Sequence, residues 1–220
     1  MLYIVSTPIG NLEDITLRAL RTLKEVDYIA AEDTRQTQKI LNKYEIKTKT
    51  ISFHSYSSDE KLNRIIDLLN EGKNVALVSD AGTPGISDPA YSLVKRAIQE
   101  EITISPIPGP SSLLAALVMS GLPMDKFLYL GFLPLKKGRQ TLLKELAEEK
   151  RTLVIFESPH RILKTLGNLK EYLGNRQIAV CREITKIYEE AVRGTIEEVT
   201  EEFTNKKPKG EFVLVVKGPK

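Results

Sequence analysis

Residues 74–89 read Asn-Val-Ala-Leu-Val-Ser-Asp-Ala-Gly-Thr-Pro-Gly-Ile-Ser-Asp-Pro, an apolar run that passes into a loop rich in glycine and proline. The run from Val75 to Val78 is typical of a buried strand, and Asp88-Pro89 is typical of a helix start. In the loop between this strand and this helix start, glycines and prolines fix an unusual backbone path and leave main-chain N–H and C=O groups accessible. Such a loop at the carboxyl end of a strand is where open α/β sheets bind small molecules, although a tight structural turn has the same composition.

On both sides of this loop, short apolar runs alternate with amphipathic helical patterns. The alternation predicts an α/β protein with largely parallel strand pairing in its first half. We predict strands at 2–5, 27–31, 50–53, 75–78, 102–105, 127–131, 152–156, 177–182 and 211–216. Helices are expected around 17–23, from a cap at Ser58 or Asp59 to Gly72, and around 90–100, 113–119, 139–149 and 160–172. The segment from Pro106 to Ser112 is the one richest in residues that end helices and strands. It predicts a boundary between an N-terminal α/β domain at 1–110 and a C-terminal α/β domain at 111–220.

Composition narrows the class of protein. The chain has 220 residues, of which 41% are hydrophobic and 28% charged, as is usual for a globular protein. Its single cysteine excludes an internal disulfide and a cysteine metal cluster. No apolar run reaches transmembrane length and Met1 to Val5 does not resemble a signal peptide, so we expect a cytoplasmic protein without a membrane partner.

The charge of the chain is informative only locally. A formal net charge of +3 is too small to indicate nucleic-acid binding by itself. Lys136, Lys137 and Arg139 nevertheless lie close together in a polar joint between two predicted elements. This joint is expected either to contact RNA phosphates or to be an ordinary solvated face.

Four loops have the same position and composition: each follows an apolar strand and is rich in glycine, proline and small polar residues. They are Ser6–Asn11, Asp80–Gly85, Pro108–Ser112 and Glu157–Arg161. Loops that follow parallel strands meet at one edge of a sheet, and the fourth loop belongs to the second predicted domain. We therefore expect the four loops to bind one ligand in a cleft between the two halves.

The motifs in these loops make the chain resemble a known family, the tetrapyrrole methylase superfamily. The resemblance covers nearly the whole length, and the order and spacing of the motifs match. They are Ser6-Thr-Pro-Ile-Gly-Asn-Leu12, Glu32-Asp-Thr-Arg35, Val78-Ser-Asp-Ala-Gly-Thr-Pro-Gly-Ile-Ser-Asp-Pro89, Pro108-Gly-Pro-Ser-Ser112 and Phe156-Glu-Ser-Pro-His-Arg161. Porphyrin-type members carry G-x-G-x-G-D where this chain has Thr-Pro-Ile-Gly-Asn, so the chain is most similar to the members that methylate small-subunit ribosomal RNA.

The resemblance implies two α/β domains of the tetrapyrrole methylase type, with S-adenosylmethionine in the cleft between them, and a homodimer. It also implies 2′-O-methylation of a cytidine ribose in the decoding region of 16S rRNA, with the assembled small subunit as the expected substrate. The cofactor contacts that it implies are Pro8, Asp80, Ala81, Gly82, Thr83, Pro84, Ser111, Ser112, Phe132, Leu133 and Gly210.

Methyl transfer from a sulfonium is an in-line displacement, so the protein mainly has to position the reactants and exclude water. A ribose hydroxyl also benefits from a general base or from nearby cations. The candidate catalytic residues are Asp33, Arg35, Glu157, Arg182 and Lys186, with Glu157 or Asp33 as the base.

Each candidate also has a purely structural interpretation. Asp33 and Arg35 are suited to pairing at a helix start, and Glu157 is suited to an ion pair with Arg161 four residues later. Arg182 and Lys186 are likewise placed to pair with neighbouring acids.

Two other functions remain open at this stage. One is a methyltransferase of the same fold that acts on a precorrin-type tetrapyrrole. The other is a non-catalytic RNA-binding module, against which the intact cofactor loops argue.

Overall fold

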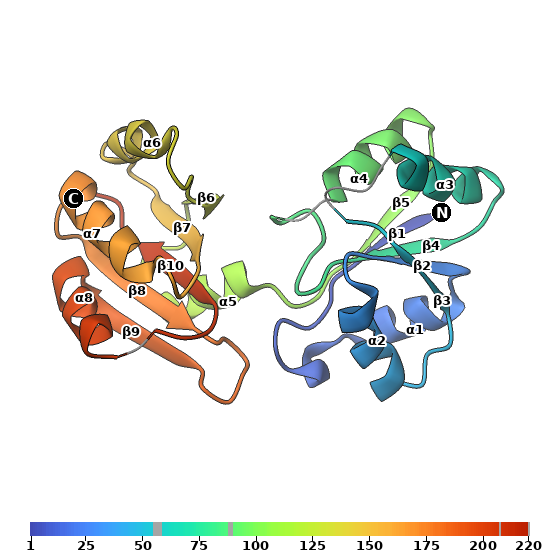
Figure 1. Cartoon of the computed structure of the whole chain (residues 1–220), viewed down its shortest axis with the longest axis horizontal. Helices are drawn as coiled ribbons and strands as arrows, with labels where there is room; N and C mark the ends of the chain where they lie inside the picture. Colours follow the sequence, from blue (N-terminus) through green and yellow to red (C-terminus); the bar gives the residue numbers. More distant parts are fainter. Residues whose placement is uncertain (55–58, 88–89, 207, 220) are drawn as a thin grey trace. The chain divides into compact units, whose positions relative to one another are not determined.

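The computed structural model describes residues 1–54, 59–87, 90–206 and 208–219. The chain divides into two compact units, Met1–Ser111 and Ser112–Lys220, and each is described by itself below (Figure 1). The predicted α/β class is confirmed in both units. The helix start predicted at Asp88-Pro89 and the alternative cap Ser58 lie outside the described residues.

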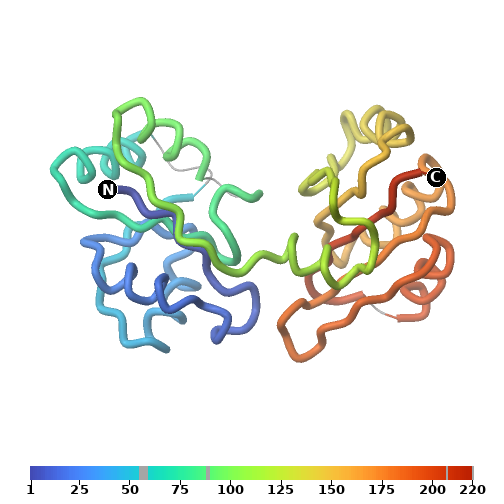
Figure 2. Tube along the Cα trace, turned by 180° about the vertical axis from the view of Figure 1, so that it is seen from behind, coloured from blue at the N-terminus to red at the C-terminus, as the bar shows by residue number. Residues whose placement is uncertain are grey.

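Unit 1 is built on a five-stranded sheet with the strand order β3-β2-β4-β1-β5. Each strand is four residues long: β1 Leu2–Val5, β2 Tyr28–Ala31, β3 Lys49–Ser52, β4 Val75–Val78 and β5 Ile104–Ile107. All four pairs of neighbours are parallel, which confirms the pairing predicted for the first half. Figure 2 shows β1 and β5 side by side, so the loops that follow them leave the sheet at the same edge.

Helices cover both faces of this sheet, which explains why its strands are short continuous apolar runs. One face carries a short 3₁₀ helix, Leu12–Asp14, with α1 Leu17–Glu25 and α2 Thr34–Lys43 (Figure 1). The other face carries α3 Asp59–Asn70 and α4 Ala90–Gln99. Along β4, Ala76 and Val78 pack in the core with α1 and α2, whereas Val75 and Leu77 pack in the core with α3 and α4.

Unit 2 is built on a second five-stranded sheet, in the order β6-β7-β10-β8-β9. Its strands are β6 Phe127–Phe132, β7 Thr152–Glu157, β8 Gln177–Arg182, β9 Glu190–Thr195 and β10 Phe212–Val216. Only β6 and β7 pair in parallel, and the other three pairs are antiparallel. The last strand of the chain is therefore inserted in the centre of the sheet, between β7 and β8.

The helices of unit 2 also lie on both faces of its sheet (Figure 1). One face is covered by α6 Arg139–Leu146, α7 Ile162–Leu173 and α8 Ile196–Asn205, which share the largest apolar core. The other face is contacted by α5 Ser112–Ser120. Cys181 lies on this second face as a buried strand residue, and its thiol contacts the carbonyl of Ala116 at 3.8 Å.

Two elements of unit 2, β9 and α8, were not predicted from the sequence. Within the described residues, no helix is both long and apolar enough to cross a membrane.

Candidate functional site

The loops that follow β1 and β4 are joined by a two-way backbone bridge. The N–H of Thr7 donates to the carbonyl of Gly82 at 2.9 Å, and the N–H of Gly82 donates back to Thr7 at 3.0 Å. The Thr7 hydroxyl also donates to the carbonyl of Ser79 at 3.0 Å, and the hydroxyls of Ser6 and Thr83 are 2.9 Å apart. These bonds fix the two glycine- and proline-containing loops as one substructure.

The segment after β5 approaches the same substructure closely. A Cβ atom added at Gly109 would lie 2.9 Å from the Cβ of Ser6, so only glycine fits there without a shift of the neighbouring loop. A Cβ at Gly82 would lie 3.8 Å from the carbonyl oxygen of Pro110, and the φ of +82° at Gly82 itself favours glycine. Three of the four predicted loops therefore meet at the carboxyl edge of the unit 1 sheet.

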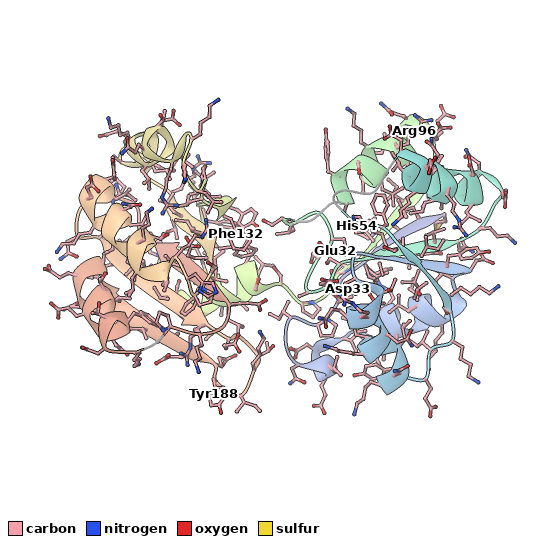
Figure 3. All side chains as sticks on the ribbon, in the orientation of Figure 1. Glu32, Asp33, His54, Arg96, Phe132 and Tyr188 are labelled. Atoms are coloured by element: carbon pink, nitrogen blue, oxygen red, sulfur yellow. The ribbon has the colours of Figure 1, made fainter. Side chains whose placement is uncertain are left out.

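The segment after β2 contributes charge to this edge. Asp33 is the N-cap of α2 and accepts hydrogen bonds from the backbone N–H of Arg35 at 2.8 Å and from its guanidinium at 2.7 Å. The backbone N–H of Asp33 donates to the carboxylate of Asp80 at 2.9 Å, which links α2 to the loop after β4. Figure 3 shows Glu32 and Asp33 near His54, at the edge where β2 and β3 end.

Arg35 determines the electrostatics of Asp33. Its hydrogen bonds, first from the side chain and then from the backbone, lower the pKa of the Asp33 carboxyl to about 2. The same contact raises the pKa of the Arg35 guanidinium, whose side chain is 88% exposed. Asp33 is therefore a weak base at neutral pH, whereas the exposed Arg35 is an accessible hydrogen-bond donor.

The structure places most of the predicted cofactor residues of unit 1 in this joined substructure. Pro8, Gly82 and Pro84 are buried, whereas Asp80 and Ala81 are exposed. Ser111 directly precedes α5, and Ser112 is the first residue of that helix.

In unit 2, Glu157 is a fully buried carboxylate at the end of β7, with 0% of its side chain exposed. One oxygen accepts from the guanidinium of Arg161 at 2.7 Å and from the backbone N–H of Ser158 at 2.7 Å. The other accepts from the Thr165 hydroxyl at 2.6 Å. With both oxygens bonded inside the unit, Glu157 has the geometry of a positioning residue and is poorly placed to take a proton from a substrate.

Arg161 connects this carboxylate to the strand end that carries Phe132 and Leu133. Its guanidinium donates to the carbonyl of Leu133 at 3.4 Å and lies 5.9 Å from the centre of the Phe132 ring. Phe132 is 53% exposed, and its ring packs edge-on against Phe156 at 5.8 Å. Leu133 is buried. Thus Glu157 fixes Arg161, and Arg161 in turn contacts two predicted cofactor residues.

Arg139 does not have the role that the sequence suggested. The joint of Lys136, Lys137 and Arg139 was expected either to contact RNA phosphates or to be a solvated face, but only 7% of Arg139 is exposed. Its guanidinium donates inward to the hydroxyl of Thr165 at 2.8 Å and to the side chain of Asn168 at 3.0 Å. Arg139 is therefore a buried part of the Glu157 network, whereas the two lysines are exposed.

Arg182, the last residue of β8, and Lys186, which follows the strand, belong to a separate charged group. Lys186 is bonded to the carboxylates of Glu183 and Glu211, at 2.9 Å in each case. The Nε of Arg182 lies 3.4 Å from a carboxylate oxygen of Glu190. The local ion pairing considered for these two residues is therefore present.

Gly210, the last predicted cofactor residue, lies against this charged group. Its φ is +89°, and a Cβ atom there would collide with the Glu183 carboxylate. The backbone at Gly210 therefore lies close to Glu183, and a larger residue there would require the Glu183 side chain to move.

The predicted site residues thus fall into three groups, one at the carboxyl edge of the unit 1 sheet and two in unit 2. Sequence reasoning left Thr165 out of the site and assigned no role to Thr7, although Thr7 lies in the predicted loop Ser6–Asn11. Thr165 had a visible signal, because it follows Glu157 and Arg161 at steps of four residues, the spacing of one helix face. Thr7 had none, since its role depends on a bridge to a residue more than seventy positions away.

Known proteins are similar to this chain over most of its length. The family model of the Tetrapyrrole (Corrin/Porphyrin) Methylases matches residues 1–200. A relative from Halalkalibacterium halodurans called ribosomal RNA small subunit methyltransferase I is 53% identical over 99% of this chain and 75% of its own length. A relative of the same name from Thermotoga maritima is 51% identical over 99% of this chain and 98% of its own length.

Solved structures support the fold at lower sequence identity. The methyltransferase CobJ superimposes with a TM-score of 0.74 and 18% identity, over 99% of this chain and 93% of that chain. The uroporphyrin-III C-methyltransferase from Thermus thermophilus, complexed with S-adenosylhomocysteine, gives a TM-score of 0.67 and 21% identity, over 97% of this chain and 96% of that chain.

Proposed function

This chain belongs to the tetrapyrrole methylase family and is a methyltransferase, and we propose that it 2′-O-methylates a cytidine ribose in the decoding region of 16S rRNA. The observation that carries this proposal is the 51% identity to the Thermotoga maritima relative over nearly the full length of both chains. The names of these relatives support small-subunit ribosomal RNA as the substrate class. The cytidine and its 2′-oxygen are part of the proposal.

The methyl donor is S-adenosylmethionine, and we propose that loops of both units contact it. The exposed residues Asp80 and Ala81 in the loop after β4 and the close approach of Gly109 to Ser6 support a small-molecule site in unit 1. We assign the donor contacts to Pro8, Asp80, Ala81, Gly82, Thr83, Pro84, Ser111, Ser112, Phe132, Leu133 and Gly210.

For the transfer step, we propose catalysis by positioning and by cations. A pKa of about 2 makes Asp33 a poor base, and the oxygens of Glu157 are bonded to three internal donors. In this proposal Asp33 orients Arg35, and Glu157 orients Arg161. Arg35, Arg182 and Lys186 then bind the ribose or its phosphates and stabilise charge that develops on the attacking oxygen.

We further propose that the substrate is the assembled small subunit and that the enzyme acts in the cytoplasm as a homodimer. These features follow from the family and are independent of the residue assignments above.

The test is methyl transfer from radiolabelled S-adenosylmethionine to small subunits that lack the modification. Label should enter 16S rRNA and protect one linkage from alkaline cleavage, because a 2′-O-methyl group removes the nucleophile that cleaves the adjacent phosphodiester. Subunits that already carry the methyl group are the matched control and should accept none. Label that enters only a tetrapyrrole precursor would contradict the RNA assignment and leave the family unchanged.

A further inference from the structure

A pocket with both polar and apolar lining residues, the latter including Leu135 and Leu143, opens between α6 and α7 in unit 2, outside the residues assigned to the methyl donor. Its volume is about 270 Å³. The side chains that determine its chemistry are Lys136, Arg139, Lys164, Asn168, Glu171 and Tyr172. On α7, Lys164, Asn168 and Glu171 follow one another at steps of four and three residues, so they lie on one helix face. One side of the pocket is therefore a stripe of polar residues on α7.

The pocket has a rigid, positively charged lining residue. Arg139 is buried, and its three hydrogen bonds fix the guanidinium to Asn168, to Thr165 and to the carbonyl of Pro134. The Asn168 side-chain oxygen accepts from Arg139, which leaves the amide N–H groups of Asn168 as donors. No acceptor for them exists among the described residues.

Two lysines flank this lining. Lys136 and Lys164 are exposed, and within the described ranges neither makes an ion pair. By contrast, Lys170 on the same helix as Lys164 is paired with Glu197 at 2.8 Å. Lys136 and Lys164 are thus available to an external anion.

The balance of charge indicates which anion fits. Three cations line the pocket, and Glu171 is the single acid among its lining residues. The ammonium and amide donors suit phosphate oxygens, the Glu171 carboxylate suits the 2′-hydroxyl of a ribose, and the Tyr172 ring adds an apolar surface. A ribose phosphodiester presents all of these partners together.

We propose that this pocket binds a ribose phosphodiester of the RNA strand near the methylated nucleotide. Lys136 and Lys164 contact the phosphate, Asn168 donates to it, and Glu171 accepts from a ribose hydroxyl. This inference rests on the proposed function, because it takes RNA as the substrate. It differs from the sequence expectation in that Lys137 and Arg139 do not contact phosphate.

The test compares two double variants with the same loss of charge. Lys136→Gln/Lys164→Gln removes both lysines of the pocket, and Lys137→Gln/Lys144→Gln removes an adjacent lysine and a lysine of α6 that lie outside it. For the pocket variant, we expect the KM for unmodified small subunits to rise about tenfold. The plot of log binding constant against log salt concentration should have a slope that is shallower by about 0.7 to 0.9. This is the change expected when one phosphate contact is lost. Affinity for S-adenosylhomocysteine and the rate at saturating subunits should stay unchanged.

The control variant should change the KM less than twofold, and circular dichroism should show that both variants are folded. Equal effects of the two variants, or an unchanged KM and salt slope in the pocket variant, would overturn the inference. Direct binding of both variants to purified small subunits is measured in parallel, without methyl transfer. If the wild-type protein binds subunits but transfers no label, the proposed function fails while this binding comparison still decides the pocket.

Discussion

Arg35 reaches back two residues to the carboxylate that caps its own helix, and this contact changes what Asp33 is able to do. An aspartate that follows a strand of a parallel sheet suggests a general base, but a carboxylate bonded to a guanidinium holds its proton weakly. The sequence shows both residues and their spacing. It does not show that the side chain of Arg35 turns toward Asp33 rather than toward solvent, because that choice depends on the cap geometry of α2.

Replacing Arg35 by glutamine should raise the pKa of Asp33 from about 2, although it should stay below 3.8 because backbone N–H groups still donate to the carboxylate. The folded-state pKa is lowered, so this contact contributes stability above pH 3.8 and loses it as the pH falls toward 2. Carboxyl ¹³C NMR titration of wild type and Arg35→Gln measures the shift directly. We also expect methyl transfer to fall at least tenfold in Arg35→Gln.

A matched control exists in the same chain. Arg151 binds Glu149 two residues earlier and lowers the pKa of that carboxyl to about 2 as well, but the pair lies outside every proposed site. Arg151→Gln should shift the pKa of Glu149 and leave methyl transfer unchanged. An unchanged pKa of Asp33 in Arg35→Gln would show that the backbone alone lowers it.

At the scale of elements, the strands of unit 1 were predictable because helices cover both faces of the sheet and short apolar runs mark its strands. In unit 2, β9 escaped prediction because Val192 is its only fully buried residue. The central position of β10 in its sheet could not be predicted from the sequence either, because the order of strands depends on contacts between residues far apart in the chain.

Helix α8 escaped prediction although its start has a recognisable signal. Thr195 and Glu198 form a capping box in which each side chain accepts from the other residue's backbone N–H. The apolar stripe of Ile196, Val199 and Phe203 follows directly and is buried in the unit 2 core. A sequence analysis that searched for helix N-caps first, rather than for apolar runs, would have predicted this helix.

Thr195→Ala should destabilise unit 2 by about 1 kcal/mol, because the substitution removes the acceptor for the Glu198 N–H. Hydrogen exchange of the first-turn amides of α8 measures the loss locally, and urea unfolding measures it for the unit. Thr204→Ala is the control, since the Thr204 hydroxyl only donates to the Thr200 carbonyl within the same helix. Equal losses in the two variants would indicate that the cap itself contributes little.

At the scale of the whole molecule, each unit has its own apolar core, and the proposed donor residues come from both units. The sequence located the motifs in each half because they are short and local. How each motif is fixed could not be predicted, since the Thr7–Gly82 bridge and the Gly210–Glu183 contact join residues distant in sequence. A ligand that contacts both sets of loops should therefore couple two units that are otherwise separately stabilised.

S-adenosylhomocysteine provides the test of this coupling. At one hundred times its dissociation constant, a ligand that binds only the folded protein stabilises it by about 2.7 kcal/mol. We expect hydrogen exchange to slow at 79–85 in unit 1 and also at 131–134 and 209–211 in unit 2. Amides in the middle of α1 and α8, which contain no proposed donor contact, serve as internal controls and should change less. Slowing confined to unit 1 would remove Phe132, Leu133 and Gly210 from the donor site, whereas slowing in both units would support a donor site that uses the whole chain.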